Sequence, residues 1–207
     1  MNLTVKEALP AFYRQYQLQP DGGAQESSVK VELVKGFSLY IPNVEARKKV
    51  VLKHDMHHVL TGYNAVMKGE TEISAWELST GCSHNWVAFT INTYGMMMGV
   101  LFNLPGIWRA WVRGRHTRNL YTSSYRDEEL LTKTVDELRI ELGLHESPPA
   151  SAKASAGWSA HPNLMGSFLS FSGFLVFGAI FSVASLVLLP ATLLYSLYII
   201  LKKGEQS

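Results

Sequence analysis

One long segment without formal charges limits what this chain can fold into. Residues 164–201 contain no Asp, Glu, Lys or Arg, and they end at Lys202 and Lys203. A transmembrane helix needs about 20 predominantly apolar residues. A buried core helix is the alternative, but the rest of the chain offers no soluble core large enough to cover so long a segment. We therefore expect residues 164–203 to insert into a membrane.

The length of this segment leaves two arrangements open. One straight helix over residues 164–201 would measure about 57 Å at the usual rise per residue, whereas the hydrocarbon slab is about 30 Å thick. We expect either a kinked, overlong span or a helical hairpin, with Pro190 or the region of Ser182 and Ser185 as the break. A hairpin would leave the rest of the chain and the two final lysines on the same side of the membrane.

The remaining sequence predicts an all-α fold, a helical bundle to which this apolar membrane segment is attached. Residues 1–143 show little strand-like alternation and are expected to form one helical domain. Residues 144–163 are rich in Pro, Ala and Ser, which is typical of a flexible linker. The expected helices cover residues 4–16, 28–40, 43–61, 70 to about 103, 108–119 and 127–142. Asn43 is the expected N-cap of its helix, and Gly62 and Gly143 suit the left-handed position after a helix.

Composition narrows the function classes. The formal net charge is only +2, so the overall charge does not indicate a nucleic-acid partner. Cys82 is the single cysteine and cannot form an intrachain disulfide, which fits a reducing compartment. The first residues, MNLTVKEALPAFYRQYQ, lack the apolar core of a secretory signal.

A second uncharged segment covers residues 78–108. We interpret it as a buried central helix rather than a membrane span, because it contains several Asn and Thr residues. Gly95 and Gly99 have the GxxxG spacing. In lipid this spacing favours a homodimer, whereas in a soluble core it permits close helix packing.

The residues HDMHH are the densest group of potential metal ligands. On a helix with about 100° per residue, His54, Asp55 and His58 continue the apolar face, whereas His57 falls on the solvent-exposed face. Burying two histidines and a carboxylate without partners would cost several kcal/mol, and a metal ion offsets that cost. The His-x-x-x-His spacing also places both imidazoles on one face. A satisfied network of core hydrogen bonds is the alternative.

Glu70 supplies a fourth donor at the start of the next helix. An antiparallel pair of helices would bring Glu70 back towards His58. Glu77 and His84 follow on the same helical stripe, so they are either outer or substrate-facing groups of the site or ordinary core hydrogen-bonding residues. Imidazole and carboxylate suit Zn²⁺ best, and iron or manganese also.

At this point the sequence resembles a known family. HDMHH followed by eleven residues and Glu70 matches HDxxH-x11-E, the signature of the Coq-four family of ubiquinone (coenzyme Q) biosynthesis. The segments HVLTGY at 58–63 and ISAWEL at 73–78 agree with it. RIELGL at 139–144 is similar to the family's closing R-x-x-L-G-hydrophobic pattern. The resemblance covers roughly residues 30–144, so the linker and the apolar tail lie outside it.

This resemblance implies a helical fold and a zinc-type divalent metal bound by His54, Asp55, His58 and Glu70. It implies work on a polyprenylated aromatic ring at the membrane, within a complex of ubiquinone-biosynthesis proteins. The activity linked to the family is oxidative decarboxylation at the ring's C1 carbon, of lyase or oxidoreductase type. A non-enzymatic scaffold that binds polyprenyl lipid and organises the other enzymes is the competing role. Four protein ligands would nearly close a tetrahedral zinc, which is typical of a structural site.

Two further expectations concern the surroundings. Four arginines interleaved with Trp108 and Trp111 either contact anionic lipid head groups or form a solvated basic face; they are Arg109, Arg113, Arg115 and Arg118. A membrane zinc hydrolase is disfavoured, because Asp55 stands where HExxH proteases have their glutamate base. The expected location is a bacterial inner membrane with the N-terminal domain in the cytoplasm.

Overall fold

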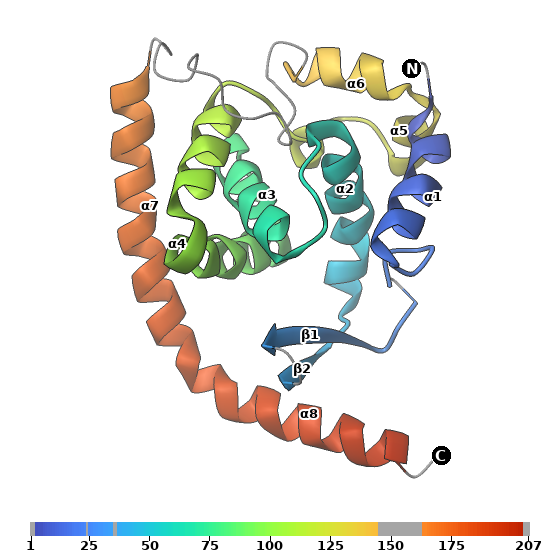
Figure 1. Ribbon diagram of the computed structural model, residues 1–207, viewed down its shortest axis with the longest axis vertical. Helices are drawn as coiled ribbons and strands as arrows, with labels where there is room; N and C mark the ends of the chain where they lie inside the picture. The colour runs from blue at the N-terminus through green and yellow to red at the C-terminus, as the bar shows by residue number, and fades with distance from the viewer. Residues whose placement is uncertain (1–2, 24, 35–36, 145–162, 205–207) are drawn as a thin grey trace.

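The computed structural model describes residues 3–23, 25–34, 37–144 and 163–204, and within these residues the chain is predominantly helical (Figure 1). The all-α class is thereby confirmed, with one small hairpin as an addition. The α-helices are α1 Val5–Tyr16, α2 Glu45–Thr61, α3 Met67–Thr80, α4 Trp86–Arg115, α5 Asp127–Thr132, α6 Val135–Glu141, α7 Leu164–Ala184 and α8 Leu189–Gly204. The strands are β1 Ser28–Val34 and β2 Phe37–Pro42, and two short 3-10 helices are η1 Leu120–Thr122 and η3 Ser185–Leu188.

The helix predicted for residues 28–40 is wrong. Strands β1 and β2 form an antiparallel pair there, with Val29 opposite Ile41 and Val31 opposite Leu39. The physical reason is visible in SVKVELV, where valines alternate with charged residues. Valine is β-branched and favours strands, and a period of two matches a pleated strand rather than a helix.

Several helix boundaries also differ from the prediction. The helix expected from residue 70 to about 103 is broken at Gly81, whose φ of 98° is left-handed, so α3 and α4 are separate. Helix α4 then continues past residue 108 with a kink at Asn103 (φ −142°, ψ 37°) just before Pro105. The helix predicted for residues 127–142 is split into α5 and α6, because Thr134 starts a new helix with its own capping box.

The predicted caps are partly right. Gly62 and Gly143 follow helical segments with φ values of 78° and 74°, as expected. Asn43 is not the N-cap of α2, because that position belongs to Val44. The Asn43 amide instead donates to the backbone carbonyls of Gly23 and Glu26, which ties the chain before β1 to the start of α2.

The core lies where α3 packs against α2 and α4. Trp76 and Ile73 on α3, Met56 on α2 and Ile107 on α4 are all fully buried. Gly99 lets α3 and α4 come close, because a Cβ added there would lie 2.6 Å from Thr71 Cβ. The GxxxG spacing therefore serves helix packing inside the chain.

We predict that Gly99→Val lowers the free energy of unfolding by about 1–3 kcal/mol, the usual cost of overpacking a core. Gly173→Val is the matched control, because an added Cβ at Gly173 meets nothing within 4 Å. Urea denaturation of the detergent-solubilised chain measures both variants. Equal midpoints for Gly99→Val and Gly173→Val would show that α3 and α4 do not need this close approach.

The apolar tail runs along the helical domain as α7 and then bends, so that α8 passes below β1 and β2 (Figure 1). Helix α7 lies beside α4, where Trp111 Nε1 donates to Ser170 Oγ at 3.1 Å. The bend occupies η3 and Pro190, as expected. Helix α8 contacts β2 through Ser196 Oγ, which is hydrogen-bonded to the Tyr40 backbone. Because α8 turns off from the end of α7 and does not run back alongside it, the tail is kinked and is not a helical hairpin (Figure 1).

Among the described residues, two helical segments are long and apolar enough to span a membrane. They are Trp86–Thr122, with mean hydropathy 1.3, and Leu164–Ala184, with 1.9. In the apolar 18-residue stretch of each segment, 39% is buried within the protein for the first and only 17% for the second, so α7 is the less protein-covered of the two. Most of the predicted linker, residues 145–162, lies outside the described residues.

Candidate metal centre

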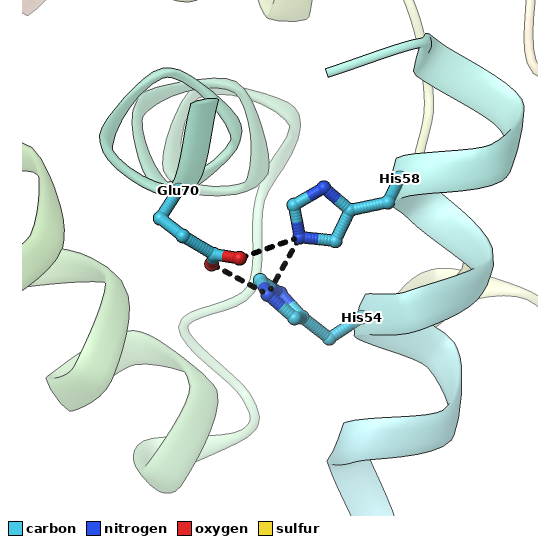
Figure 2. Close-up of side chains that lie close together, drawn as sticks. All are labelled: His54, His58 and Glu70. Carbon is cyan, nitrogen blue, oxygen red and sulfur yellow. Dashed lines mark hydrogen bonds and ion pairs between the residues drawn. The ribbon is translucent and has the colours of Figure 1, made fainter. Parts of the chain in front are cut away.

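Three of the predicted ligands converge between α2 and α3 (Figure 2). His54 and His58 lie one turn apart on α2, and Glu70 lies in the first turn of α3. Glu70 Oε2 is 3.3 Å from His54 Nε2, and Glu70 Oε1 is 3.3 Å from His58 Nε2. The two Nε2 atoms are 3.2 Å apart. The left-handed Gly62 ends α2 and lets the chain turn back to deliver Glu70.

The outer nitrogen of each imidazole faces an oxygen that only accepts hydrogen bonds. His54 Nδ1 lies 3.0 Å from Glu77 Oε1, and His58 Nδ1 lies 3.0 Å from the backbone oxygen of Tyr63. Each Nδ1 must therefore carry hydrogen and donate, so each ring, when it is neutral, has its lone pair on Nε2. This arrangement, with a carboxylate or carbonyl behind each histidine, is the usual support of metal-binding imidazoles.

When both rings are neutral, two lone pairs and one carboxylate point at the same space. Without a positive charge between them these atoms would repel one another. A proton on one imidazole or a metal ion supplies that charge. His54, His58 and Glu70 could therefore hold a metal ion, each through one ligand atom, and these atoms all lie within 4.8 Å of one another.

The site is buried on one side and open on the other. The His58 side chain is 1% exposed and that of His54 22%, whereas the Glu70 side chain is 42% exposed. Burial alone would raise the pKa of Glu70, but hydrogen bonds from His54 and His58 outweigh it and hold the pKa well below its usual range. Burial would lower the pKa of His54, yet the carboxylates of Glu77 and Glu70 raise it well above its ordinary value.

Glu77 lies directly behind His54 and is fully buried. Its carboxylate also accepts hydrogen bonds from His57 Nδ1 at 2.6 Å, from Tyr121 Oη at 3.3 Å and from the Asn92 side chain. Burial would raise the pKa of Glu77, but the charges and hydrogen bonds of His54 and His57 outweigh it and hold the pKa well below its usual range. One carboxylate therefore connects α2, α3, α4 and η1 behind the candidate metal site.

The prediction that His57 faces solvent is wrong. His57 is fully buried, its Nε2 accepts a hydrogen bond from the Leu120 backbone N–H at 2.9 Å, and its ring packs edge-on against Trp76 and Tyr121. The reason is tertiary: η1 covers the side of α2 that a single-helix projection assigns to water. Burial lowers the pKa of His57, which favours its neutral form.

Asp55 does not join the three converging ligands in this structure. Its position lies about 100° around the helix from His54, and its Oδ2 accepts a hydrogen bond from Tyr13 Oη at 2.9 Å. Gly22 fits closely against the same carboxylate, because an added Cβ would be in steric contact with Oδ2. Burial raises the pKa of Asp55.

His84 also lies apart from the three converging ligands. Its Nε2 is 3.0 Å from the Tyr121 backbone oxygen, and the residue is exposed. The break at Gly81 removes it from the helical stripe of Glu70 and Glu77.

Sequence reasoning did not identify the residues that cover the site from α1. The Phe12 ring stacks on His58 with centroids 5.3 Å apart and planes at 24°. Tyr13, the next residue, binds Asp55. Both lie on the buried face of α1, which the apolar pattern does indicate, but no local signal shows that this face meets the HDMHH segment.

The raised pKa of His54 predicts how metal binding depends on pH. In the metal-free protein the folded state holds a proton on His54 above the ordinary pKa of about 6.5, and a metal ion must displace that proton. We expect metal affinity to rise about tenfold per pH unit from about pH 6.5 until His54 is neutral. The proton on His54 also stabilises the metal-free folded state, and this stabilisation is lost as the pH rises through the same range. Chelator competition at several pH values measures the affinity, and a flat profile would contradict the prediction.

Comparison with known proteins gives no match: no family model, no curated protein and no solved structure is significantly similar to the chain.

Proposed function

We propose that this protein is a membrane-associated, metal-dependent enzyme of ubiquinone biosynthesis. It acts on a polyprenylated aromatic ring and takes part in oxidative removal of the carboxyl group at ring carbon C1. The observation that carries the proposal is the convergence of His54, His58 and Glu70, which are spaced as in HDxxH-x11-E. The experiment that tests it is genetic complementation with a ligand variant.

The three ligand atoms suit a small divalent ion. In a tetrahedral zinc site with ligands at about 2.0–2.1 Å, neighbouring ligand atoms lie about 3.3–3.4 Å apart. The Nε2 atoms of His54 and His58 are 3.2 Å apart, which is close to that value, and each has a different Glu70 oxygen at 3.3 Å. Taken with one ligand atom per residue, the set lies within 4.8 Å. Zn²⁺ is therefore the favoured metal. A set of two histidines and one carboxylate also suits Fe²⁺, and manganese is a further candidate.

Four protein ligands would fill a tetrahedral zinc site, whereas the three that converge here do not. A zinc ion with three protein ligands keeps one position for water or substrate, as catalytic sites do. Asp55, turned to Tyr13, leaves that position free. When bound, the metal would supply Lewis-acid chemistry towards a carboxylate or phenolate oxygen.

The chain's own residues prepare the site for a substrate. Glu77 and the Tyr63 carbonyl fix the His54 and His58 rings, so that both Nε2 lone pairs face the metal position. Phe12 covers His58 and keeps water from that side. Glu70 is the most exposed of the three ligands, so the substrate ring approaches from its side.

Exposed apolar side chains support membrane association. Val176, Ile180 and Val183 on α7 are each more than half exposed, and Leu101 at the α4 kink is 84% exposed. Water disfavours so much apolar surface, whereas a bilayer accepts it. An insoluble polyprenyl chain would also reach the enzyme from the bilayer. We place the protein at a bacterial inner membrane with its N-terminal domain in the cytoplasm, beside other ubiquinone-biosynthesis proteins.

A non-enzymatic scaffold is the second candidate. It is favoured by Glu77, which joins four elements behind His54. A metal between α2 and α3 would then act as a staple, and the protein would bind polyprenyl lipid and hold the other enzymes together.

The test is complementation of a strain that accumulates carboxylated polyprenyl precursors. We expect the wild-type chain and His84→Ala to restore ubiquinone, whereas His58→Ala leaves the carboxylated precursor in place, because it lacks a metal ligand. Quinone and precursor are measured by mass spectrometry. Equal restoration by His58→Ala would reject the metal-dependent enzyme, and failure of the wild type would reject the pathway.

A further inference from the structure

Arg113 on α4 is a buried cation with an unused hydrogen-bonding edge. The residue is 2% exposed. Its Nη1 donates to the Thr61 carbonyl at 2.8 Å, at the end of α2, and its guanidinium carbon lies 5.2 Å from the centre of the Tyr63 ring. Its Nε and Nη2 are buried and have no hydrogen-bond partner among the described residues. The sequence-based expectation that Arg113 lies on a lipid-facing or solvated basic surface is therefore wrong.

A buried guanidinium with two unpaired nitrogens needs a hydrogen-bond acceptor or an opposite charge. Buried charges in proteins are normally paired, and a buried donor without an acceptor is costly. Glu77, another deeply buried charged group, follows that rule with four partners. The hydrogen bond to the Thr61 carbonyl at the end of α2 accounts for Nη1 only. The Tyr63 side chain also interacts with the guanidinium, but Nε and Nη2 of Arg113 have no acceptor within hydrogen-bonding geometry among the described residues.

The two unused donors define the chemistry of the missing partner. Nε–H and Nη2–H lie on one edge of the planar guanidinium and point the same way. That edge binds the two oxygens of a carboxylate or phosphate in parallel, and such bidentate pairs are the strongest that arginine forms. We propose that Arg113 is an oxyanion-binding residue, which takes a carboxylate or phosphate group through Nε and Nη2.

The surroundings keep the guanidinium in place for this task. The bond to Thr61 holds one end, and the guanidinium lies over the Tyr63 ring, so the Nε and Nη2 edge is the part that remains for an anion. The two contacts come from the last residue of α2 and from the turn after it. Both lie close to His58, whose Nδ1 donates to the Tyr63 carbonyl. The anion site is thus next to the candidate metal centre in the fold, but it requires neither a metal nor the proposed function.

The test measures anion binding to the full-length chain in detergent, stripped of metal with a chelator. The probes are sodium benzoate and sodium phosphate, each against sodium chloride at equal ionic strength. We expect at least one probe to raise the melting temperature of the wild type in a saturable way. Arg113→Lys keeps the charge but lacks the bidentate edge, so it should bind that probe at least about tenfold more weakly. Arg115→Lys, on the exposed side of the same helix, should bind it as the wild type does.

A shift with benzoate alone identifies a carboxylate partner, and a shift with phosphate alone identifies a phosphate. No shift with either probe, or equal affinity in Arg113→Lys and the wild type, overturns the proposal. If Arg113→Lys does not fold, proton–nitrogen NMR of the wild type decides the question. A binding anion must move the slowly exchanging Nε–H signal of a buried arginine, and an unmoved signal rejects the site.

Discussion

His58→Ala will lower the affinity of the protein for a divalent metal by more than about a hundredfold. Loss of a partner behind a metal-binding histidine already costs about 10–100-fold, and loss of one of three direct ligands must cost more. His58 offers its Nε2 beside His54 Nε2 and a carboxylate oxygen of Glu70, and its side chain is almost completely buried. Competition with a coloured chelator at neutral pH measures the affinity of each variant.

The matched control for this measurement is His84→Ala. His84 is an exposed histidine that contacts the Tyr121 carbonyl and takes no part in the cluster. The substitution His84→Ala should therefore leave the metal affinity unchanged. If His58→Ala and His84→Ala bind metal equally well, the ligand set is different from the one described above.

Glu77→Ala will lower the free energy of unfolding by about 3–5 kcal/mol, the usual result of removing one partner from a buried charged network. The change leaves the His57 and His54 Nδ1–H groups and the Asn92 amide without their acceptor. Because His54 also loses its orientation, metal affinity should fall about 10–100-fold. Urea denaturation without metal separates the first effect from the second.

Two further variants sharpen this prediction. Glu77→Gln keeps one accepting oxygen and should lose less stability than Glu77→Ala. Glu128→Ala removes an exposed glutamate of α5 and should change stability by less than about 0.5 kcal/mol. A Glu77→Ala protein as stable as the wild type would mean that the buried carboxylate does not organise the core.

The sequence predicted the candidate site best where the signal was local. His54 and His58 could be placed together because their spacing on one helix fixes the geometry. Glu70 followed because the turn at Gly62 reverses the chain after α2. The residue type and position of Asp55 also predicted a place in this site. Because Asp55 lies one residue after His54, its side chain points about 100° further around the helix, towards α1, where Tyr13 donates a hydrogen bond to it.

The errors have a common cause in contacts between distant segments. A helical projection assigns His57 to the solvent-exposed face because the projection contains no information about η1. In the structure η1 covers His57, and Leu120, 63 residues further along the chain, donates a hydrogen bond to it. The burial of Arg113 has the same origin, since its cover is the turn between α2 and α3. The hairpin of β1 and β2 is different: its valine alternation was present in the sequence and was outweighed by the helical character of its surroundings.

Metal analysis of the full-length protein tests the central claim most directly. The chain is purified in detergent, supplied in turn with zinc, iron or manganese, freed of loosely bound ions and analysed by mass spectrometry. If His54, His58 and Glu70 hold a metal, the protein retains about one equivalent of one of these ions per chain. Retention of less than about a tenth of an equivalent of every metal would contradict the account, because a proton would then be the only positive charge between the three ligand atoms.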